Sequence, residues 1–286
     1  MKGSKIYVII ILIAAVLVAS YFVPNLLREK PEEPGETEET SPAYEIILKE
    51  CGGNLTILYD NNPYDPDLET EWGFSCLIEL EDATILFDTG GDGRILSDNM
   101  EKLGVDPDEI DYVVLSHVHQ DHIGGLYTFL EANSNVTVFV PDSFPYHVKS
   151  SIRVRGADVV EVRNATHVCE GVASTGVLGT EIEEQSLMVS TSEGLLIVTG
   201  CSHPGIVGIV EKAVELTGEE VRLVIGGFHL GGHSEAAITG IISDLKDLGV
   251  VKIAPCHCTG DTARGLFEEA FGEDYVESGV GLTLDF

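Results

Sequence analysis

The chain has 286 residues, with 48 acidic and 16 basic side chains and a formal net charge of −32. This length allows one large domain or two small ones. Such an acidic chain repels the phosphate backbone of nucleic acids, so we do not expect nucleic acid as a partner. A small anionic substrate remains compatible with the composition where bound metal ions supply local positive charge.

An unbroken apolar run covers residues 6–23 and has basic residues on both flanks. Its length suits a membrane-spanning helix, and we expect an uncleaved single-pass anchor. A cleaved secretory signal is the alternative, because Val18-Ala19-Ser20 resembles a cleavage site. The lysine and arginine counts of the two flanks are nearly equal, which leaves the topology open. We favour the N-terminus inside and so expect the domain on the extracytoplasmic side, with the cytoplasmic face as the alternative.

Residues 24–43 contain four prolines and six glutamates. A segment of this composition buries too little apolar surface to fold, which indicates a disordered linker. Residues 44–286 are then left as one globular domain. The sequence does not indicate its oligomeric state.

Short apolar runs and helical patterns follow one another along this domain. We expect strands at 44–48, 55–59, 75–80, 84–87, 112–115, 136–140, 195–198, 221–225, 251–254 and 281–286. We expect helices at 93–103, 124–132, 206–216, 235–248 and 262–271, with a less regular middle. Strands lead in the first half and alternate with helices in the second, an order that predicts an α/β (α+β) fold with two sheets between helical layers.

The segment SHVHQDHIGG, residues 116–125, follows the expected strand 112–115 directly. Alternate residues of an extended chain point the same way, so His117 and His119 can share one metal ion. Asp121 and His122 then lie across a turn, where they can reach a second ion. The alternative, a polar surface loop, does not explain three histidines and a carboxylate within six residues.

This pattern resembles the HxHxDH signature of the metallo-β-lactamase superfamily. The resemblance implies a four-layer αββα sandwich with one or two metal ions, usually zinc, at the sheet edge. It implies that His117 and His119 bind the first ion, and that Asp121 and His122 bind the second. It also implies that Asp88, in the FDTG segment, orients the histidine loop through hydrogen bonds.

Cys201 departs from the superfamily pattern, because hydrolases of the superfamily usually have a metal-bridging aspartate at this strand end. A thiolate can hold one zinc, bridge two ions, or leave the binding to His203. A buried structural cysteine is the alternative. The other cysteines do not indicate a disulfide framework.

Two further histidines follow expected strands, His229 in GGFHL and His257 in HCTG. Both are expected at the same sheet edge as the histidine loop. By the resemblance His257 matches the last ligand of the second ion. Cys256 and Cys258 flank His257 and are expected to point to the opposite side of the extended chain, so we do not expect them to bind a metal together with it. His229 is expected either as a ligand or beside the substrate.

Six segments in this order are similar to one branch of the superfamily: FDTG, SHVHQDHIGG, Glu184-Gln185-Ser186-Leu187, TGCSHPGI, GGFHL and HCTG. It is the branch of the 7,8-dihydropterin-6-methyl-4-(β-D-ribofuranosyl)aminobenzene-5′-phosphate synthases, which act in methanopterin biosynthesis. The likeness runs from about residue 55 to residue 286. One departure is Trp72, which precedes Gly73 where the branch has a histidine, in a segment expected to shape the substrate mouth.

Two divalent ions, expected to be Zn²⁺ with Mn²⁺ or iron as alternatives, would activate a water molecule. We therefore expect a membrane-anchored hydrolase that cleaves a small phosphoester or diphosphate through a metal-activated hydroxide. Asp121 would orient the hydroxide, and His203 or His229 would hydrogen-bond the oxyanion. The alternatives are a dihydropterin-type synthase, in which an arylamine displaces diphosphate, and a non-catalytic metal-binding sensor.

Overall fold

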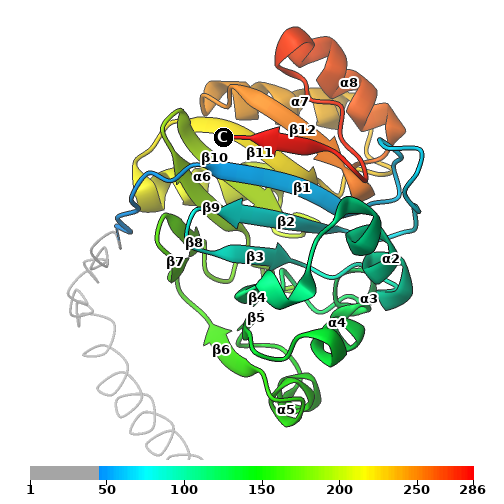
Figure 1. Cartoon of the computed structure of the whole chain (residues 1–286). Coiled ribbons are helices and arrows are strands. Elements are labelled where there is room, and N and C mark those ends of the chain that lie inside the picture. Colours follow the sequence, from blue (N-terminus) through cyan, green and yellow to red (C-terminus); the bar gives the residue numbers. More distant parts are fainter. Residues whose placement is uncertain (1–44) are drawn as a thin grey trace, which may run out of the picture. The chain divides into compact units, whose positions relative to one another are not determined.

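The computed structural model describes residues 45–286, whose strands form two mixed sheets (Figure 1). The seven-stranded sheet has the order β13-β1-β2-β3-β4-β5-β6, and the six-stranded sheet has the order β12-β11-β10-β9-β8-β7. The first sheet contains β1 (Gly53–Tyr59), β2 (Ser75–Leu80), β3 (Thr84–Phe87), β4 (Tyr112–Val114), β5 (Thr137–Pro141), β6 (Asp158–Val162) and β13 (Thr283–Asp285). The second contains β7 (Thr166–Cys169), β8 (Val172–Ser174), β9 (Leu187–Thr191), β10 (Gly194–Thr199), β11 (Val221–Gly227) and β12 (Lys252–Cys256).

Helices pack on the outer face of each sheet (Figure 1). The first sheet is covered by α2 (Gly93–Leu103), α4 (Leu126–Ala132) and α5 (Tyr146–Val154), and the second by α6 (Ile206–Thr217), α7 (Glu235–Asp247) and α8 (Asp261–Phe271). Side chains alternate along the strands, so Phe87 of β3 packs between the sheets while Leu86 packs under the helices. The layers confirm the predicted sandwich of two sheets between helices.

The parallel strands of both sheets end at the same edge of the fold. In the first sheet β3, β4, β5 and β6 are parallel to one another, and β1 points the same way because β2 is antiparallel to both β1 and β3. In the second sheet β10, β11 and β12 are parallel. Loops at the carboxyl ends of parallel strands are where α/β folds place their sites, and here these loops carry the residues singled out in the sequence.

Two parts of the sequence differ from the expected elements. Residues 45–48 contain no strand, although the N–H of Ile46 donates to the carbonyl of Leu216 at 2.8 Å. The irregular middle contains α5 and the short strands β6, β7, β8 and β9. These strands span three to five residues each, too few for a clear alternation of apolar and polar positions.

Within residues 45–286, no helix is both long and apolar enough to cross a bilayer. The anchor expected at residues 6–23 and the linker expected at residues 24–43 lie outside the described residues.

The buried side chain of Gln185 connects the two sheets next to the histidine loop. Its amide Nε2 donates to the carbonyl of Leu115, just after β4, at 2.9 Å. Its Oε1 accepts from the hydroxyl of Ser174 in β8 at 2.6 Å. Both groups are buried with it, so the amide satisfies polar atoms on each sheet that water cannot reach.

We predict that Gln185→Leu lowers the free energy of unfolding by about 2–4 kcal/mol, because it leaves buried polar groups of both sheets unpaired. Urea denaturation monitored by circular dichroism measures the change. Asn135→Leu, which also replaces an amide side chain by leucine but at an exposed position, is the matched control and should change stability little. An equal effect of the two replacements would contradict the bridging role.

Candidate metal centre

Four non-glycine residues of the described chain have a positive φ, and all follow strands that end at the site edge. They are Asp88 (56°) after β3, Ser202 (62°) after β10, His229 (52°) after β11 and His257 (45°) after β12. A left-handed backbone costs a residue with a β-carbon roughly 1–2 kcal/mol. Such strain concentrates at functional sites, where the surrounding fold holds it in place.

Three histidines form one group of possible metal donors. The nitrogen atoms of His117, His119 and His203 lie within 4.8 Å of one another. Nε2 of His117 is 3.0 Å from Nδ1 of His119, and the ring of His203 packs edge-on against both. His117 and His119 come from the loop after β4 and His203 from the loop after β10, so the two sheets contribute to one set.

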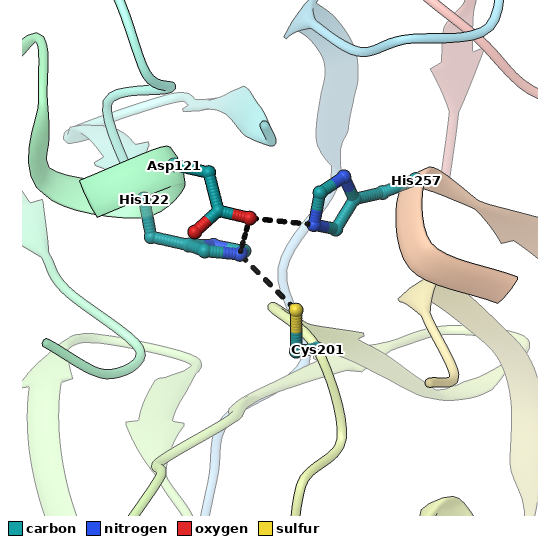
Figure 2. A group of neighbouring side chains, drawn as sticks. All are labelled: Asp121, His122, Cys201 and His257. Carbon is teal, nitrogen blue, oxygen red and sulfur yellow. Dashed lines mark hydrogen bonds and ion pairs between the residues drawn. The ribbon is translucent and has the colours of Figure 1, made fainter. Parts of the chain in front are cut away.

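A second group combines nitrogen, oxygen and sulfur donors (Figure 2). Nε2 of His122 is 3.2 Å from Sγ of Cys201 and 3.6 Å from Oδ2 of Asp121. Nε2 of His257 is 3.4 Å from the same carboxylate oxygen. Figure 2 shows the four side chains pointing toward one another from three separate segments of the chain.

Cys201 and His203 lie between these groups. Together with His229 they form a third set of neighbouring donors, so Cys201 belongs to two sets and His203 to two. From the sequence, the Cys201 thiolate could bridge two ions or bind a single one, and its position between the groups leaves both arrangements open. His229 is the exposed member, which favours a place beside the substrate.

Hydrogen bonds fix which nitrogen of each buried imidazole faces the centre. Nδ1 of His122 donates to Oδ2 of Asp88 at 2.7 Å. Ser116 donates its hydroxyl to the same oxygen at 2.6 Å, so its Oγ accepts from Nδ1 of His117 at 2.9 Å. Each ring therefore has its proton on Nδ1 and turns the lone pair of Nε2 inward, as metal ligation requires.

His257 is held in the same way from the loop after β1. Its Nδ1 donates to the side-chain oxygen of Asn61 at 2.9 Å, which frees Nε2. Its backbone N–H donates to Oδ2 of the buried Asp60 at 3.1 Å. Asp60 and Asn61 were not singled out in the sequence, although they follow a predicted strand as the other site residues do.

The donors fit a metal ion. Within residues 45–286, the Nε2 atoms of His203 and His257 are buried without a hydrogen-bond partner. Burial and the neighbouring imidazoles hold the pKa of His117 well below its usual range, and burial lowers that of His203 to about 4. Neutral imidazoles, a carboxylate and a thiol are the donors that zinc and related metals take.

Glu184 positions the loop that carries Cys201 and His203. Its buried carboxylate accepts from the backbone N–H groups of Cys201 and Ser202 at 2.9 Å each and of His203 at 2.8 Å. Burial raises the pKa of Glu184, and these three donors oppose the rise. The sequence marked Glu184 only as part of a motif, because its partners are backbone groups with no side-chain signature.

Cys258 lies beside the centre, contrary to the expectation that it points away with Cys256. Its Sγ contacts the carbonyl of Cys201 at 3.6 Å. Hydrogen bonding from the Cys201 thiol lowers the pKa of Cys258 despite its burial, and His229 contributes in the same direction. The turn after β12, which begins at His257 with a positive φ, breaks the alternation on which the expectation rested.

The structure thus brings together every residue that the sequence proposed for the site. The donor groups contain His117, His119, Asp121, His122, Cys201, His203, His229 and His257, and Asp88 lies directly beneath them. His147, His167 and His233 belong to none of the donor groups among the described residues. Which residues bind an ion and which contact substrate stay predictions.

Comparison with known proteins gives one family and two curated relatives. Residues 73–215 match the model of the metallo-beta-lactamase superfamily. The chain is 32% identical over 280 residues to the 7,8-dihydropterin-6-methyl-4-(beta-D-ribofuranosyl)-aminobenzene-5′-phosphate synthase of Methanocaldococcus jannaschii, covering 81% of this chain and 95% of that protein. It is 29% identical to an uncharacterized protein of the same organism, covering 72% of this chain and 90% of that protein.

Solved structures share the fold. A metal-dependent hydrolase of the beta-lactamase superfamily superposes with a TM-score of 0.68 and 28% identity, covering 81% of this chain and 98% of that one. A diphosphatase from the PhnP family gives a TM-score of 0.58 at 14% identity, covering 82% and 97%. The second likeness shows the fold alone.

We predict that Asp88→Asn weakens metal binding about 10- to 100-fold, because the amide presents a donor to Ser116 or His122 where the carboxylate accepts. Competition with a chromogenic chelator measures the affinity. Asp111→Asn is the control, since Asp111 accepts from the N–H of Thr84 at the opposite end of the same strands. Unchanged affinity in Asp88→Asn would contradict the orienting role.

We predict that the cobalt(II)-loaded protein shows a near-ultraviolet thiolate-to-metal absorption band that Cys201→Ser removes. Cys51→Ser should keep the band, because Sγ of Cys51 contacts the carbonyl of Ser190, away from the centre. Loss of the band in Cys258→Ser but not in Cys201→Ser would assign the sulfur ligand to Cys258 instead.

Proposed function

Because the chain belongs to the metallo-β-lactamase superfamily, we propose that it is a metal-dependent enzyme that joins a dihydropterin to an arylamine. In this reaction the amine nitrogen attacks the methylene carbon on the pterin. A carbon–nitrogen bond forms, the carbon–oxygen bond to diphosphate breaks, and the amine loses one proton. Diphosphate leaves with the electron pair of the broken bond.

The observation that supports the synthase reaction most strongly is the extent of the likeness to the archaeal synthase. It covers nearly the whole length of that relative and most of this chain, more than the part matched by the superfamily model. A similarity confined to the histidine loop would indicate only a metal site. This one extends over much of the chain that surrounds the centre.

Metal ions, when bound, would supply Lewis-acid stabilisation of the departing diphosphate. His117, His119 and His203 form one set of residues that would hold an ion. Asp121, His122, Cys201 and His257 form the other. The hydrogen bonds that the imidazoles donate to Asp88, Ser116 and Asn61 keep them in the tautomer that binding requires.

Asp121 is half-buried and His229 is exposed, so both are accessible enough to meet the reactants. Burial raises the pKa of Asp121, but the neighbouring imidazoles of His257 and His122 outweigh burial and leave this pKa below its ordinary value. Asp121 therefore stays ionised and can accept a hydrogen bond from the attacking amine, whose proton is lost to solvent. His229 is exposed at the opposite side of Cys201 and can donate a hydrogen bond to the leaving diphosphate.

Hydrolysis is the second candidate function. It is favoured by the structural likeness, at 28% identity, to a metal-dependent hydrolase that is covered almost completely by this chain. Water would replace the arylamine as nucleophile, and a small phosphoester or diphosphate would be the substrate. The same residues would serve both reactions, so the nucleophile distinguishes them.

The two functions differ in where the domain would work. Pterin intermediates are cytosolic, so the synthase reaction requires the expected anchor to hold the domain at the cytoplasmic face, the alternative orientation. A hydrolase could act on either side. A fusion of the full-length chain to a topology reporter separates these arrangements.

We predict that the zinc-loaded enzyme releases diphosphate from a dihydropterin-methyl diphosphate only when the arylamine is present. Asp121→Ala should lower this rate at least about 100-fold, because it removes a donor of the second set. Coupled phosphate detection measures the release, and mass spectrometry identifies the joined product. Release at the same rate without the amine would favour the hydrolase, and no release under either condition would reject both reactions.

A further inference from the structure

Trp72 is the single tryptophan of the chain, and it lies beside the metal centre with half of its surface open to solvent. The side chain is 53% exposed, which makes it one of the few large apolar residues of the described chain on the surface. Its ring centroid is 4.9 Å from that of His257, with the two planes inclined by 52°. An indole in this place leaves apolar surface in contact with water, which is unfavourable unless a partner covers it.

The backbone around Trp72 is fixed to the histidine loop. The N–H of Phe74 donates to the carbonyl of Asp121 at 3.2 Å. Gly73 has a φ of 145°, and a β-carbon there would collide with the same carbonyl. A β-carbon on Gly91 would meet the carbonyl of Trp72 at 2.9 Å. The segment thus has little freedom to withdraw, and the indole stays next to the donors.

The metal-donor side chains of the centre are polar. Imidazoles, a carboxylate and thiols make up the donor groups, and they suit a charged leaving group. None of them offers a broad apolar face. Trp72 therefore provides an apolar surface for the uncharged part of a substrate.

We propose that Trp72 is the stacking face for a flat aromatic ring of the substrate. An offset or inclined ring packed on an indole is the arrangement that aromatic side chains favour. The contact with His257 sets the distance between that ring and the second donor group. This inference rests on the proposed function, whose two reactants are the flat pterin and the arylamine, and it makes Trp72 a determinant of substrate specificity.

The single tryptophan makes the first test direct, since all indole fluorescence comes from this site. The zinc-loaded protein is titrated with pterin, with 4-aminobenzoate and with inorganic diphosphate. We expect saturable quenching by at least one flat compound and none by diphosphate alone. The identity of the quenching compound shows whether the ring that stacks on Trp72 is that of the pterin or that of the arylamine. Quenching no greater than that of free N-acetyltryptophanamide would overturn the proposal.

The second test uses variants and calorimetry, which does not depend on the fluorophore. Trp72→Ala should weaken binding of the flat compound about three- to tenfold, while Trp72→Phe retains most of it. Tyr146→Ala, which removes an aromatic ring that is 79% exposed on α5, is the matched control. Zinc content and diphosphate binding should not change in any variant. Equal affinity in Trp72→Ala, or a parallel loss of zinc and diphosphate binding, would contradict the stacking role.

Turnover separates this inference from the proposed function. A rise in KM for one flat substrate with an unchanged kcat in Trp72→Ala supports both. Saturable quenching without any turnover leaves the stacking face in place and rejects the reaction. Turnover with an unchanged KM in Trp72→Ala supports the reaction and overturns the stacking face.

Discussion

Buried carboxylates that accept hydrogen bonds from the loops at the strand ends hold the centre together. Asp88 accepts from the N–H and hydroxyl of Ser116 and from His122. Glu184 binds three consecutive backbone N–H groups of the loop after β10, and Asp60 binds that of His257. A buried carboxylate is stable only when such donors surround it, so each one dictates the path of the loop around it.

The need to surround a buried carboxylate with donors also brings the two sheets together at one edge. Asp88 and Ser116 belong to the first sheet, and the backbone of Gly200, from the second, packs directly on them. A β-carbon on Gly200 would collide with the Ser116 hydroxyl and lie 3.0 Å from Oδ2 of Asp88. The close approach is what lets His203 and Cys201 meet the histidine loop, since the first two donor groups each take residues from both sheets.

The sequence could predict that these side chains meet, because their chemistry and position coincide. His117, Cys201 and His257 are residue types that bind metals, and each follows an apolar run that reads clearly as a strand. The supporting residues were harder to find. Glu184 acts on backbone groups, and Cys258 approaches Cys201 only because of a turn that alternation cannot anticipate. The strands β6 to β9 were missed because they are short, and their pairing with neighbouring strands rather than their own pattern defines them.

The donor groups draw on chain segments that are far apart, from the loop after β4 to the turn after β12. They come together only after both sheets have formed and docked, so a complete site belongs to the fully folded state. An ion bound there would link the two sheets through its ligands. Its affinity for the native state would then add directly to the stability of the domain. Withdrawal of that ion would loosen the docking of the sheets first at this edge, so the availability of metal would govern how long the folded protein survives as well as what it does.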